Sequence, residues 1–515
     1  MLNLGEIVAA HARLQPQKIG VRDSRRTLTF AQWNARACRL ANALLGLGLK
    51  KGDRVALLAY NRLEWMEIYI GLAKAGLVAV PVNFRLVGPE VQYIVEHSAA
   101  KAIVVQDELA HLVEPLRGEL DIPASAWILI GNSTPAGWTS YEALLAHGTD
   151  AEPGVAVGPK DTWALMYTSG TTGKPKGAIR NHEGMALISM VTALDMGLAR
   201  DHTALLVMPM CHANSLNFAS TFTYLGATIV VDDRKSFDAE ALLATMASQG
   251  VTFTSLVPTH YIMTLALPEA VKAKYDVSRI GKLMISSAPA RKDTKLAILE
   301  HFRNSQLYEL YGSSEAGWVT LLRPDEQIEH LGSVGREWTG SGPVRMLDPD
   351  GNEVPDGEVG ELFSCTPYTF DGYLNDPQNT AEAIRADGYC SVGDMARRDE
   401  QGFIHLVDRK SNMIISGGEN VYPSEIENIL GRFAGVKDVA VVGVPHEKWG
   451  EVAHAVIVLH DGGTATETEV LEWCRDKMAG YKRPRAVTFI ADADMPRTAT
   501  GKILHRVLRE RLSDS

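Results

Sequence analysis

The sequence predicts an α/β protein with a large N-terminal domain, built from βα-layered subdomains plus a β-rich subdomain, and a small α+β C-terminal domain. Three observations support this fold class. Strand-like and helix-like segments alternate over residues 52–105, and short strands separated by turns occupy about 332–408. A compact run of strands and helices follows residue 412. A chain of 515 residues also exceeds what one hydrophobic core usually organises.

The N-terminal part begins with a short amphipathic helix and continues with βα units, which are typical of a parallel sheet. We expect strands at residues 54–59, 78–82 and 102–105, and helices at 63–75 and 89–97. The alternation returns later as a strand at 282–286, a helix at 292–302 and a strand at 306–310.

Turn residues such as Asp348-Pro-Asp-Gly351 divide the β-rich segment. Between the apolar strand 403–407 and the next apolar run lie residues 409–411. We predict a hinge there, between a domain of residues 1–408 and a C-terminal domain of residues 412–515. The latter is expected to contain helices at 424–431, 466–478 and 503–512, with strands at 439–444 and 453–459. Thr466 and Glu469 have the spacing of a capping box, which supports the second of these helix starts.

Composition and charge narrow the classes of function. The formal net charge of −11 argues against bulk nucleic-acid binding. Five cysteines without a CxxC motif indicate free thiols in a reducing compartment. The longest apolar stretch, residues 68–82, is interrupted by Lys74 and Pro81 and is too short for a membrane span. No signal peptide is evident, so we expect a cytoplasmic protein.

A basic loop rich in glycine and hydroxyl residues, YTSGTTGKPKG, covers residues 167–177 directly after an apolar run. Glycines allow close approach of a ligand to the backbone, and successive N–H groups can bind an anion. Hydroxyls and lysines add donors, so phosphate is the natural ligand. The Walker A pattern is not met, because Lys174 is followed by proline. A flexible surface loop is the alternative for this segment taken alone.

Four further motifs follow along the chain. In YELYGSSEA, residues 308–316, an aromatic ring could stack on a base and an acid could hold a metal, although Tyr311 alone is compatible with simple packing. In YCSVGD, residues 389–394, the carboxylate of Asp394 could bind two ribose hydroxyls. The alternative is an ordinary aspartate on a solvated turn. DRKSNMIISGGENVYP covers residues 408–423. PRTATGKI covers residues 496–503 and places Lys502 at a helix start. The helix dipole disfavours a cation there, which argues against an ordinary surface lysine.

All five motifs, in this order, resemble the adenylate-forming superfamily of acyl-CoA synthetases, adenylation domains and luciferases. The resemblance covers essentially the whole chain and is closest to bacterial fatty-acyl-CoA and aryl-CoA ligases, including the 4-chlorobenzoate type. It implies an ATP-dependent carboxylate–CoA ligase. The acid and ATP would give acyl-AMP and pyrophosphate, and acyl-AMP and CoA would then give acyl-CoA and AMP. The co-substrates and cofactor implied are ATP, CoA and Mg²⁺.

The resemblance also implies roles for individual residues in nucleotide binding and catalysis. Lys502, His212 and Glu315 would be catalytic, and Glu315 would ligate Mg²⁺. A mobile ammonium on Lys502 would stabilise the charge that develops on phosphorus. ATP and AMP would be bound by Thr168, Ser169, Gly170, Thr171, Thr172, Gly173, Lys174, Ser287, Ala288, Pro289, Glu309, Tyr311, Gly312, Ser314, Asp394, Arg409 and Lys502.

The remaining residues implied by the resemblance concern the acid, CoA and the hinge. The acyl pocket would be lined by His212, Asn214, Ser215, Gly317 and Trp318. CoA would meet Gly417, Gly418, Tyr481, Arg483 and Arg485. Ser411 would be the hinge residue about which a mobile small domain turns between the two half-reactions.

Polar Asn214 and Ser215 would either meet a polar group on the acid or have an ordinary structural role. A bulky Trp318 favours a short, medium-length or aromatic acid. The alternatives are a long-chain fatty acyl-CoA synthetase, a stand-alone adenylation enzyme that loads a carrier protein, a luciferase-like oxygenase and a catalytically silent nucleotide sensor. We expect small-molecule partners, no nucleic acid and no membrane span. A homodimer is one expectation for the assembly.

Overall fold

In the computed structural model, the chain is described over residues 3–168, 174–286, 290–416, 419–475, 477–498 and 501–513. It divides into two compact units. The first comprises Met1–Pro343 and Ser364–Cys390, and the second comprises Val344–Phe363 and Ser391–Ser515. The predicted α/β class is confirmed. The β-rich segment contributes to both units, and the domain boundary at residue 408 stays a prediction.

One sheet of the first unit is parallel apart from its last strand. Its inner strands β3, β4 and β5 are mostly apolar and, apart from Arg54 at the start of β3, buried, which is typical of a parallel sheet covered on both faces. The strand positions predicted near residues 54, 78 and 102 are confirmed. In spatial order the strands are β7 (Thr139–Ser140), β6 (Trp127–Ile130), β5 (Ala102–Gln106), β3 (Arg54–Leu58), β4 (Val78–Val82), β8 (Thr162–Thr168) and β9 (Lys176–Asn181).

The second sheet of this unit has a parallel centre and antiparallel edges. The strand predicted at residues 306–310 continues to Ser313, because β14 pairs with β15 through the turn that follows. In spatial order the strands are β16 (Arg336–Glu337), β15 (Gly317–Leu322), β14 (Gln306–Ser313), β13 (Lys282–Ile285), β12 (Phe253–Leu256), β10 (Thr203–Leu206), β11 (Thr228–Val231), β1 (Ile19–Arg22) and β2 (Thr27–Thr29).

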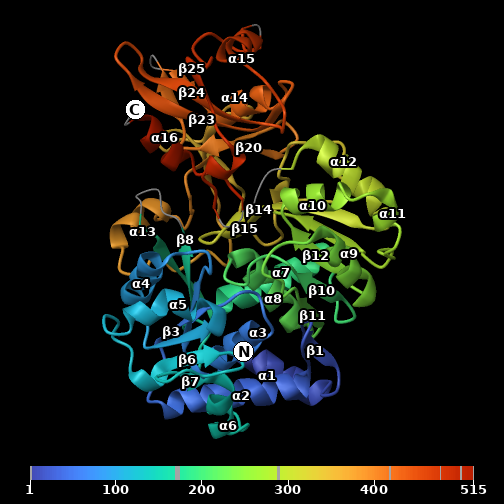
Figure 1. Cartoon of the computed structure of the whole chain (residues 1–515), viewed down its shortest axis with the longest axis vertical. Helices are drawn as coiled ribbons and strands as arrows, with labels where there is room; N and C mark the ends of the chain where they lie inside the picture. The colour runs from blue at the N-terminus through green and yellow to red at the C-terminus, as the bar shows by residue number, and fades with distance from the viewer. Residues whose placement is uncertain are drawn as a thin grey trace. The chain divides into compact units, whose positions relative to one another are not determined.

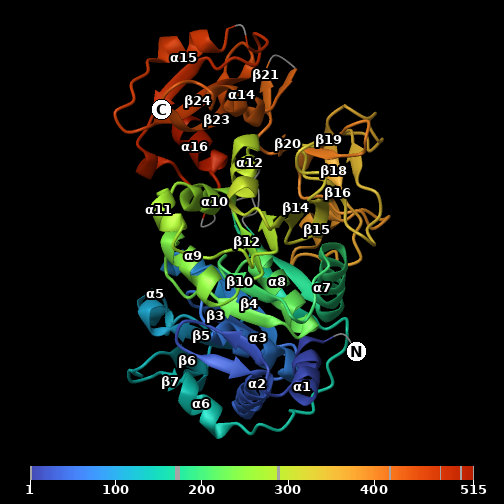
Figure 2. The same cartoon turned by 90° about the vertical axis from the view of Figure 1, so that its right-hand side faces the viewer.

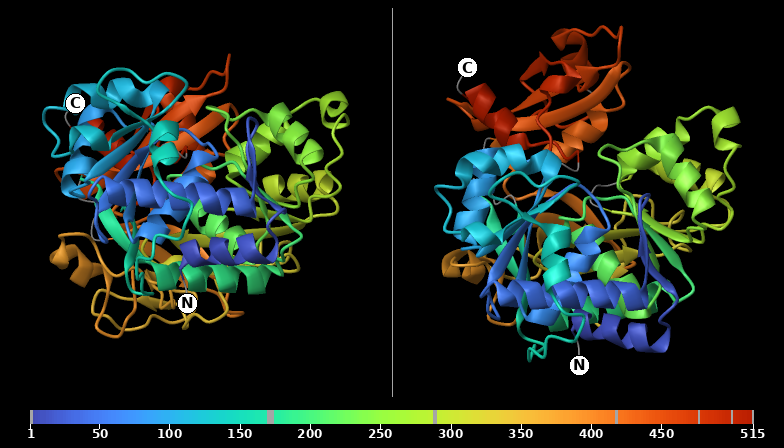
Figure 3. Two further views of the ribbon diagram at one scale, coloured as in Figure 1. Left: turned by 90° about the horizontal axis from the view of Figure 1, so that it is seen from below. Right: turned by 60° about the horizontal axis from the view of Figure 1, so that its bottom comes forward.

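Two helices of the first unit, α3 and α8, lie between its sheets in Figures 1 and 2. Every residue of α3 is buried, as are most residues of α8, which fits a central layer. The blue helices α1 and α2 pack side by side in Figure 3. The helices are α1 (Leu4–Leu14), α2 (Phe30–Gly46), α3 (Glu64–Ala75), α4 (Gly88–His97), α5 (Ala110–Val113), α6 (Tyr141–His147), α7 (His182–Met196), α8 (Ala213–Leu225), α9 (Ala239–Ser248), α10 (Pro258–Leu265), α11 (Glu269–Lys272), α12 (Lys292–His301) and α13 (Pro377–Ala383).

The second unit contains an antiparallel sheet from the predicted β-rich segment and a further sheet from the C-terminal part. The first sheet orders its strands β17 (Arg345–Leu347), β18 (Gly360–Phe363), β19 (Asp394–Arg398) and β20 (Ile404–Arg409). The other orders its strands β22 (Glu419–Val421), β21 (Ile414–Ser416), β24 (Gly450–Leu459) and β23 (Val436–His446), and β25 (Ala486–Phe489) pairs with β24.

Helices cover both faces of the C-terminal sheet. Val439 and Val441 of β23 face a core shared with α14 (Pro423–Leu430) and α15 (Glu467–Trp473), whereas Ala440 and Val442 face α16 (His505–Ser513). This alternation is the period of two that a strand imposes. The predicted capping box of α15 is confirmed.

The helix predicted at residues 466–478 is too long. It ends at Trp473, because the Cys474 N–H bonds to the carbonyl of Leu471, three residues back, and closes the last turn.

Within the described residues, no helix combines the length and apolar character that crossing a membrane requires.

Candidate active site

The glycine- and hydroxyl-rich loop joins two paired strands of the first unit. Strands β8 and β9 are antiparallel, with Tyr167 opposite Gly177 and Thr168 opposite Lys176. The predicted phosphate-binding loop therefore begins and ends on two strands that are paired in the sheet. Lys174 lies with its ammonium 5.5 Å from the ring centre of Tyr93. The other predicted loop residues, Ser169, Gly170, Thr171, Thr172 and Gly173, lie outside the described residues.

The carboxylate of Glu315, the predicted metal ligand, is buried and held by hydroxyl groups. Thr168 Oγ1 donates to Glu315 Oε1 at 3.2 Å, and the Tyr373 hydroxyl donates to the same oxygen at 2.9 Å. The structure thus brings together two predicted site residues that are 147 positions apart.

A buried guanidinium supports the backbone of the same turn. Arg180 donates to the carbonyl oxygens of Ser314 and Glu315 at 3.1 and 3.2 Å. Burial lowers the pKa of Arg180 to about 10, against the opposing charge of Glu315, so the side chain remains cationic at neutral pH. The guanidinium of Arg180 therefore holds the backbone of Ser314, a predicted nucleotide-binding residue, and of Glu315, the predicted metal ligand.

The turn between β14 and β15 requires glycine. The register of the two strands shifts after Tyr311, which is half-buried, and a Cβ on Gly312 would meet the Gly317 carbonyl oxygen at 2.2 Å. Ser313 Oγ accepts a hydrogen bond from the Ala316 N–H at 2.9 Å. These contacts bring the predicted base-stacking ring of Tyr311 to the end of its strand, next to the turn that carries Glu315.

Glu309, which the resemblance assigns to ATP binding, forms a buried ion pair with Lys295 of α12. Burial raises the pKa of Glu309, while the charge of Lys295 and the N–H of Ala290 act in the opposite direction. This carboxylate therefore ties strand β14 to α12 and to Ala290. Ser287, Ala288 and Pro289, which the resemblance also assigns to ATP binding, lie outside the described residues.

The two polar residues predicted for the acyl pocket have partners within the protein. Asn214 Nδ2 donates to Ser286 Oγ at 2.7 Å and to Ser255 Oγ at 3.1 Å. Ser215 Oγ donates to the carbonyl of Met208 at 2.6 Å. These bonds favour the structural alternative for Ser215, and they place Asn214 beside the residue that precedes Ser287.

His212 is the N-cap residue of α8, and its Nε2 is buried without a hydrogen-bond partner in the described part of the chain. Burial, with a smaller contribution from Arg85, lowers the pKa of His212 to about 4. The imidazole is therefore neutral at pH 7. Burial also raises the pKa of Cys211 to about 12, so that thiol stays protonated.

Trp318, the predicted far wall of the acyl pocket, is held in place on several sides. Its Nε1 donates to Thr192 Oγ1 at 2.9 Å, and its ring centre lies 5.4 Å from that of Phe218. Gly317 has φ 72°, and a Cβ there would meet the Tyr368 ring at 2.6 Å. The indole therefore has little freedom to move aside for a longer ligand.

In the second unit, two residues that the resemblance assigns to nucleotide binding form an ion pair. Asp394 and Arg409 are opposite each other in strands β19 and β20, and Arg409 Nε lies 2.5 Å from Asp394 Oδ1. Arg409 also donates to the Val392 carbonyl at 3.0 Å. The register of this sheet thus brings together two residues that the sequence places 15 positions apart.

Lys502 belongs to the same unit and is exposed on a turn. The Thr498 N–H donates to the Lys502 carbonyl at 2.7 Å, and the Lys502 N–H donates to Thr498 Oγ1 at 3.1 Å. The protein atoms around the ammonium and then the Arg409 charge lower the pKa of Lys502, while Asp394 raises it.

The residues predicted for CoA and the hinge are mostly on the surface. Tyr481 and Arg485 are exposed, and Arg483 Nε donates to the Met478 carbonyl at 3.2 Å. Ser411 is exposed. Gly417 and Gly418 lie outside the described residues.

A carboxylate next to the predicted hinge organises the chain there. Asp408 accepts hydrogen bonds from the Asn412 amide at 3.0 Å and from the Ser424 N–H at 2.9 Å.

Three residues that contact predicted site residues were missed by sequence reasoning: Arg180, Lys295 and Tyr373. Arg180 and Lys295 lie in ordinary strand and helix patterns. Tyr373 follows a glycine with φ 124°, whose position against Thr380 could have marked a constrained turn. Their partners are distant in sequence, which is why no local pattern identified them.

The chain belongs to the AMP-binding enzyme family, the adenylate-forming superfamily predicted from its motifs. The AMP-binding enzyme family matches residues 8–374, and the AMP-binding enzyme C-terminal domain matches residues 425–502.

Among the curated relatives, the feruloyl-CoA synthase of an Amycolatopsis species is 37% identical over 99% of both chains. The long-chain-fatty-acid–CoA ligase FadD13 of Mycobacterium tuberculosis is 35% identical over 94% of this chain and 93% of its own. Among solved structures, ATP-bound MatB from Rhodopseudomonas palustris is 30% identical, with a TM-score of 0.87 over 99% of both chains.

Proposed function

We propose that this protein is an ATP-dependent carboxylate–CoA ligase that forms AMP. In the first step, a carboxylate oxygen of the acid attacks the α-phosphorus of ATP, and the bond to the bridging oxygen breaks to release pyrophosphate. In the second, the sulfur of CoA attacks the acyl carbon, the carbon–oxygen bond to AMP breaks, and the thiol loses its proton. The observation that carries the proposal is the hydrogen bond from Thr168, of the glycine-rich loop motif, to Glu315, of the motif at residues 308–316, whose backbone Arg180 holds at Ser314 and Glu315.

Mg²⁺ is the cation that fits Glu315. Within the described residues, no group of three or more acidic, histidine or cysteine side chains could hold a metal ion by itself. A single carboxylate completed by phosphate oxygens and water is the pattern by which proteins bind Mg²⁺ with nucleotides. The ion would offset negative charge on the phosphates, while Thr168 and Tyr373 keep the carboxylate in place.

The charged residues of the chain would bind different parts of the nucleotide. Lys174 and the loop of residues 168–173 would bind the β- and γ-phosphates, and Asp394 with Arg409 would hold the ribose. Lys502 would stabilise the five-coordinate phosphorus, where its charge is more useful in the transition state than in the ground state.

For the second step, the small domain would turn about Ser411. Gly417 and Gly418 would then border the pantetheine, and Tyr481, Arg483 and Arg485 would meet the nucleotide of CoA. The cytoplasmic location and the homodimer stay predictions.

We further propose that the acid is short, medium-length or aromatic. The support is the fixed indole of Trp318, which limits the length of the pocket, together with the neutral imidazole of His212, which presents no charge to the acyl group. The name of the feruloyl-CoA synthase relative points the same way, whereas that of FadD13 supports the long-chain alternative.

The test is a substrate screen that measures AMP release and pyrophosphate exchange into ATP. We expect exchange with hydroxycinnamic, benzoic or short-chain acids, and thioester formation with free CoA. Exchange only with acids longer than about twelve carbons would replace the substrate proposal with the long-chain alternative. Transfer to a carrier protein but not to CoA would indicate a carrier-loading enzyme. No exchange with any acid, from folded protein, would refute the ligase.

A further inference from the structure

The segment of residues 370–380 contacts Glu315 at two points. The Phe370 N–H donates to the Glu315 carbonyl oxygen at 2.7 Å, and the Tyr373 hydroxyl donates to the Glu315 carboxylate at 2.9 Å. Both the backbone and the side chain of Glu315 are thus held by the segment of residues 370–380. The segment follows β15 by nearly fifty positions.

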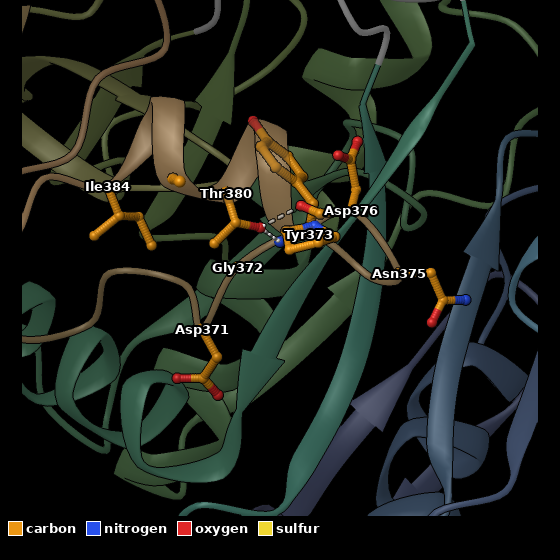
Figure 4. Close-up of a pocket in the computed structure, with 9 residues that line it drawn as sticks. Asp371, Gly372, Tyr373, Asn375, Asp376, Thr380 and Ile384 are labelled. Carbon is orange, nitrogen blue, oxygen red and sulfur yellow. Dashed lines mark hydrogen bonds between the residues drawn. The ribbon is translucent and has the colours of Figure 1, made fainter.

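Both the backbone and the ring of Tyr373 have contacts with other described residues. Its N–H donates to Thr380 Oγ1 at 2.9 Å, and Thr380 Oγ1 donates to the Asp376 carbonyl at 2.7 Å, as the dashed lines of Figure 4 show. The Lys176 ammonium lies 5.2 Å from the centre of the Tyr373 ring, and the Phe370 ring meets it edge-on at 4.9 Å. The backbone of Tyr373 is therefore fixed to α13, and its phenol cannot turn away without losing the contacts with Lys176 and Phe370.

Both hydroxyl donors of Glu315, those of Thr168 and Tyr373, meet the same oxygen, Oε1. Within the described residues, no hydrogen bond is made to Oε2. In this carboxylate, Oε1 therefore accepts two hydrogen bonds, whereas Oε2 accepts neither of them. Groups that orient a metal ligand are commonly worth about 10–100-fold in metal affinity.

We propose that Tyr373 is a positioning residue for the cation site of Glu315: its hydroxyl fixes Oε1 and so presents Oε2 to the Mg²⁺ that accompanies ATP. This inference rests on the proposed role of Glu315. Thr380 has a supporting part, because it fixes the backbone of Tyr373. The wall of the pocket in Figure 4, which both residues line, is thus a support for the metal ligand.

The experiment measures the binding of ATP to the full-length protein by calorimetry, without acid, once with Mg²⁺ and once with EDTA. The dissociation constant in EDTA divided by the dissociation constant in Mg²⁺ reports how much the cation contributes to ATP binding. Tyr373→Phe should lower this ratio about 10-fold while ATP affinity in EDTA is unchanged. A general structural defect would weaken binding in both conditions and leave the ratio as it was.

Tyr141→Phe is the matched control. Its hydroxyl also donates to a buried carboxylate, Glu67 Oε2, at 2.9 Å, but in a part of the unit that holds no candidate site residue. It should leave the ratio unchanged. Should Tyr373→Phe fail to fold, Thr380→Val takes its place, with a smaller expected loss.

Glu315→Gln separates the two levels of the proposal. If Glu315→Gln lowers the ratio and both Tyr373→Phe and Thr380→Val match the wild type, the positioning role is wrong and the proposed metal ligand stands. If Glu315→Gln has the wild-type ratio, the metal role of Glu315 is wrong, and the role of Tyr373 falls with it.

Discussion

In the first unit, Glu315 is buried among hydrogen bonds from Thr168, Tyr373 and Arg180, whereas in the second unit Lys502 is exposed on a turn. The first arrangement fixes a carboxylate at the cost of burying charge, which is tolerable only because each charged group has partners. The second places a cation on a residue that is exposed at the surface of its unit.

This contrast teaches how the proposed reaction divides its requirements. A carboxylate that holds a metal has to be in place before the nucleotide arrives, since pre-organised groups need not be ordered during the reaction. A lysine that acts in one half-reaction only has to be able to leave. The predictions below test whether the two units differ in the way this contrast requires.

The largest effect is expected from breaking the buried pair of Lys295 and Glu309. Lys295→Met should lower the free energy of unfolding by about 3–5 kcal/mol, because it leaves Glu309 buried without its counter-charge. Replacing both residues, Lys295→Met with Glu309→Leu, should recover most of this loss. Urea unfolding of the purified variants measures both values.

Lys74→Met is the control for that experiment. Lys74 is equally buried, but its partner Glu152 has a side chain that is 53% exposed, so the orphaned carboxylate stays hydrated. A loss as large as that of Lys295→Met would contradict the argument that it is the buried partner that makes the Lys295 change costly.

The next effect concerns the exposed lysine. Lys502→Ala should slow adenylation by about 10²–10³-fold, the range for removing one group that stabilises developing charge. It should spare thioester formation from supplied acyl adenylate, and stability should change little because the side chain is exposed. Each half-reaction is measured separately, with Lys448→Ala, another exposed lysine of the second unit, as control. Equal losses in both half-reactions would refute the division of labour.

The first unit should also lose stability in acid through His182. Burial lowers the pKa of this histidine to about 4, so the unfolded chain, with an ordinary pKa near 6.5, takes up the proton first. Stability is therefore lost as the pH falls from about 6.5 to 4, by about 2 kcal/mol at pH 5 for this residue. His182→Gln should reduce the fall in unfolding free energy between pH 7 and 5. An unchanged slope would show that His182 is not the group responsible.

The smallest effect, of opposite sign, is expected in the second unit. Although burial lowers it, the hydrogen bond from His505 Nε2 to Glu427, 2.7 Å long, raises the pKa of His505 above its ordinary value. Its stabilisation is complete below about pH 6.5 and is lost as the pH rises through the folded-state pKa. His505→Gln should therefore cost about 1 kcal/mol at pH 6 and less at pH 8.5. A cost that grows with pH would contradict the assignment.

Much of the fold could be predicted from local patterns. The alternation near residues 54–105 gave strands β3, β4 and β5 almost residue for residue, because their apolar runs and turn residues are local signals. The end of α15 was missed, since helix ends depend on capping contacts that propensity describes poorly. Strand β14 was predicted too short because its last residues pair with β15 across a glycine turn.

The sequence by itself determined which segments carry phosphate, metal and lysine chemistry, because glycine, hydroxyl and charged residues at fixed spacing express that chemistry locally. Only the tertiary structure decided how those segments are held. Tyr373, Arg180 and Lys295 act on partners between 14 and 135 positions away. Such contacts follow from sheet order and helix packing, which bring distant residues together without leaving a pattern in the neighbouring sequence.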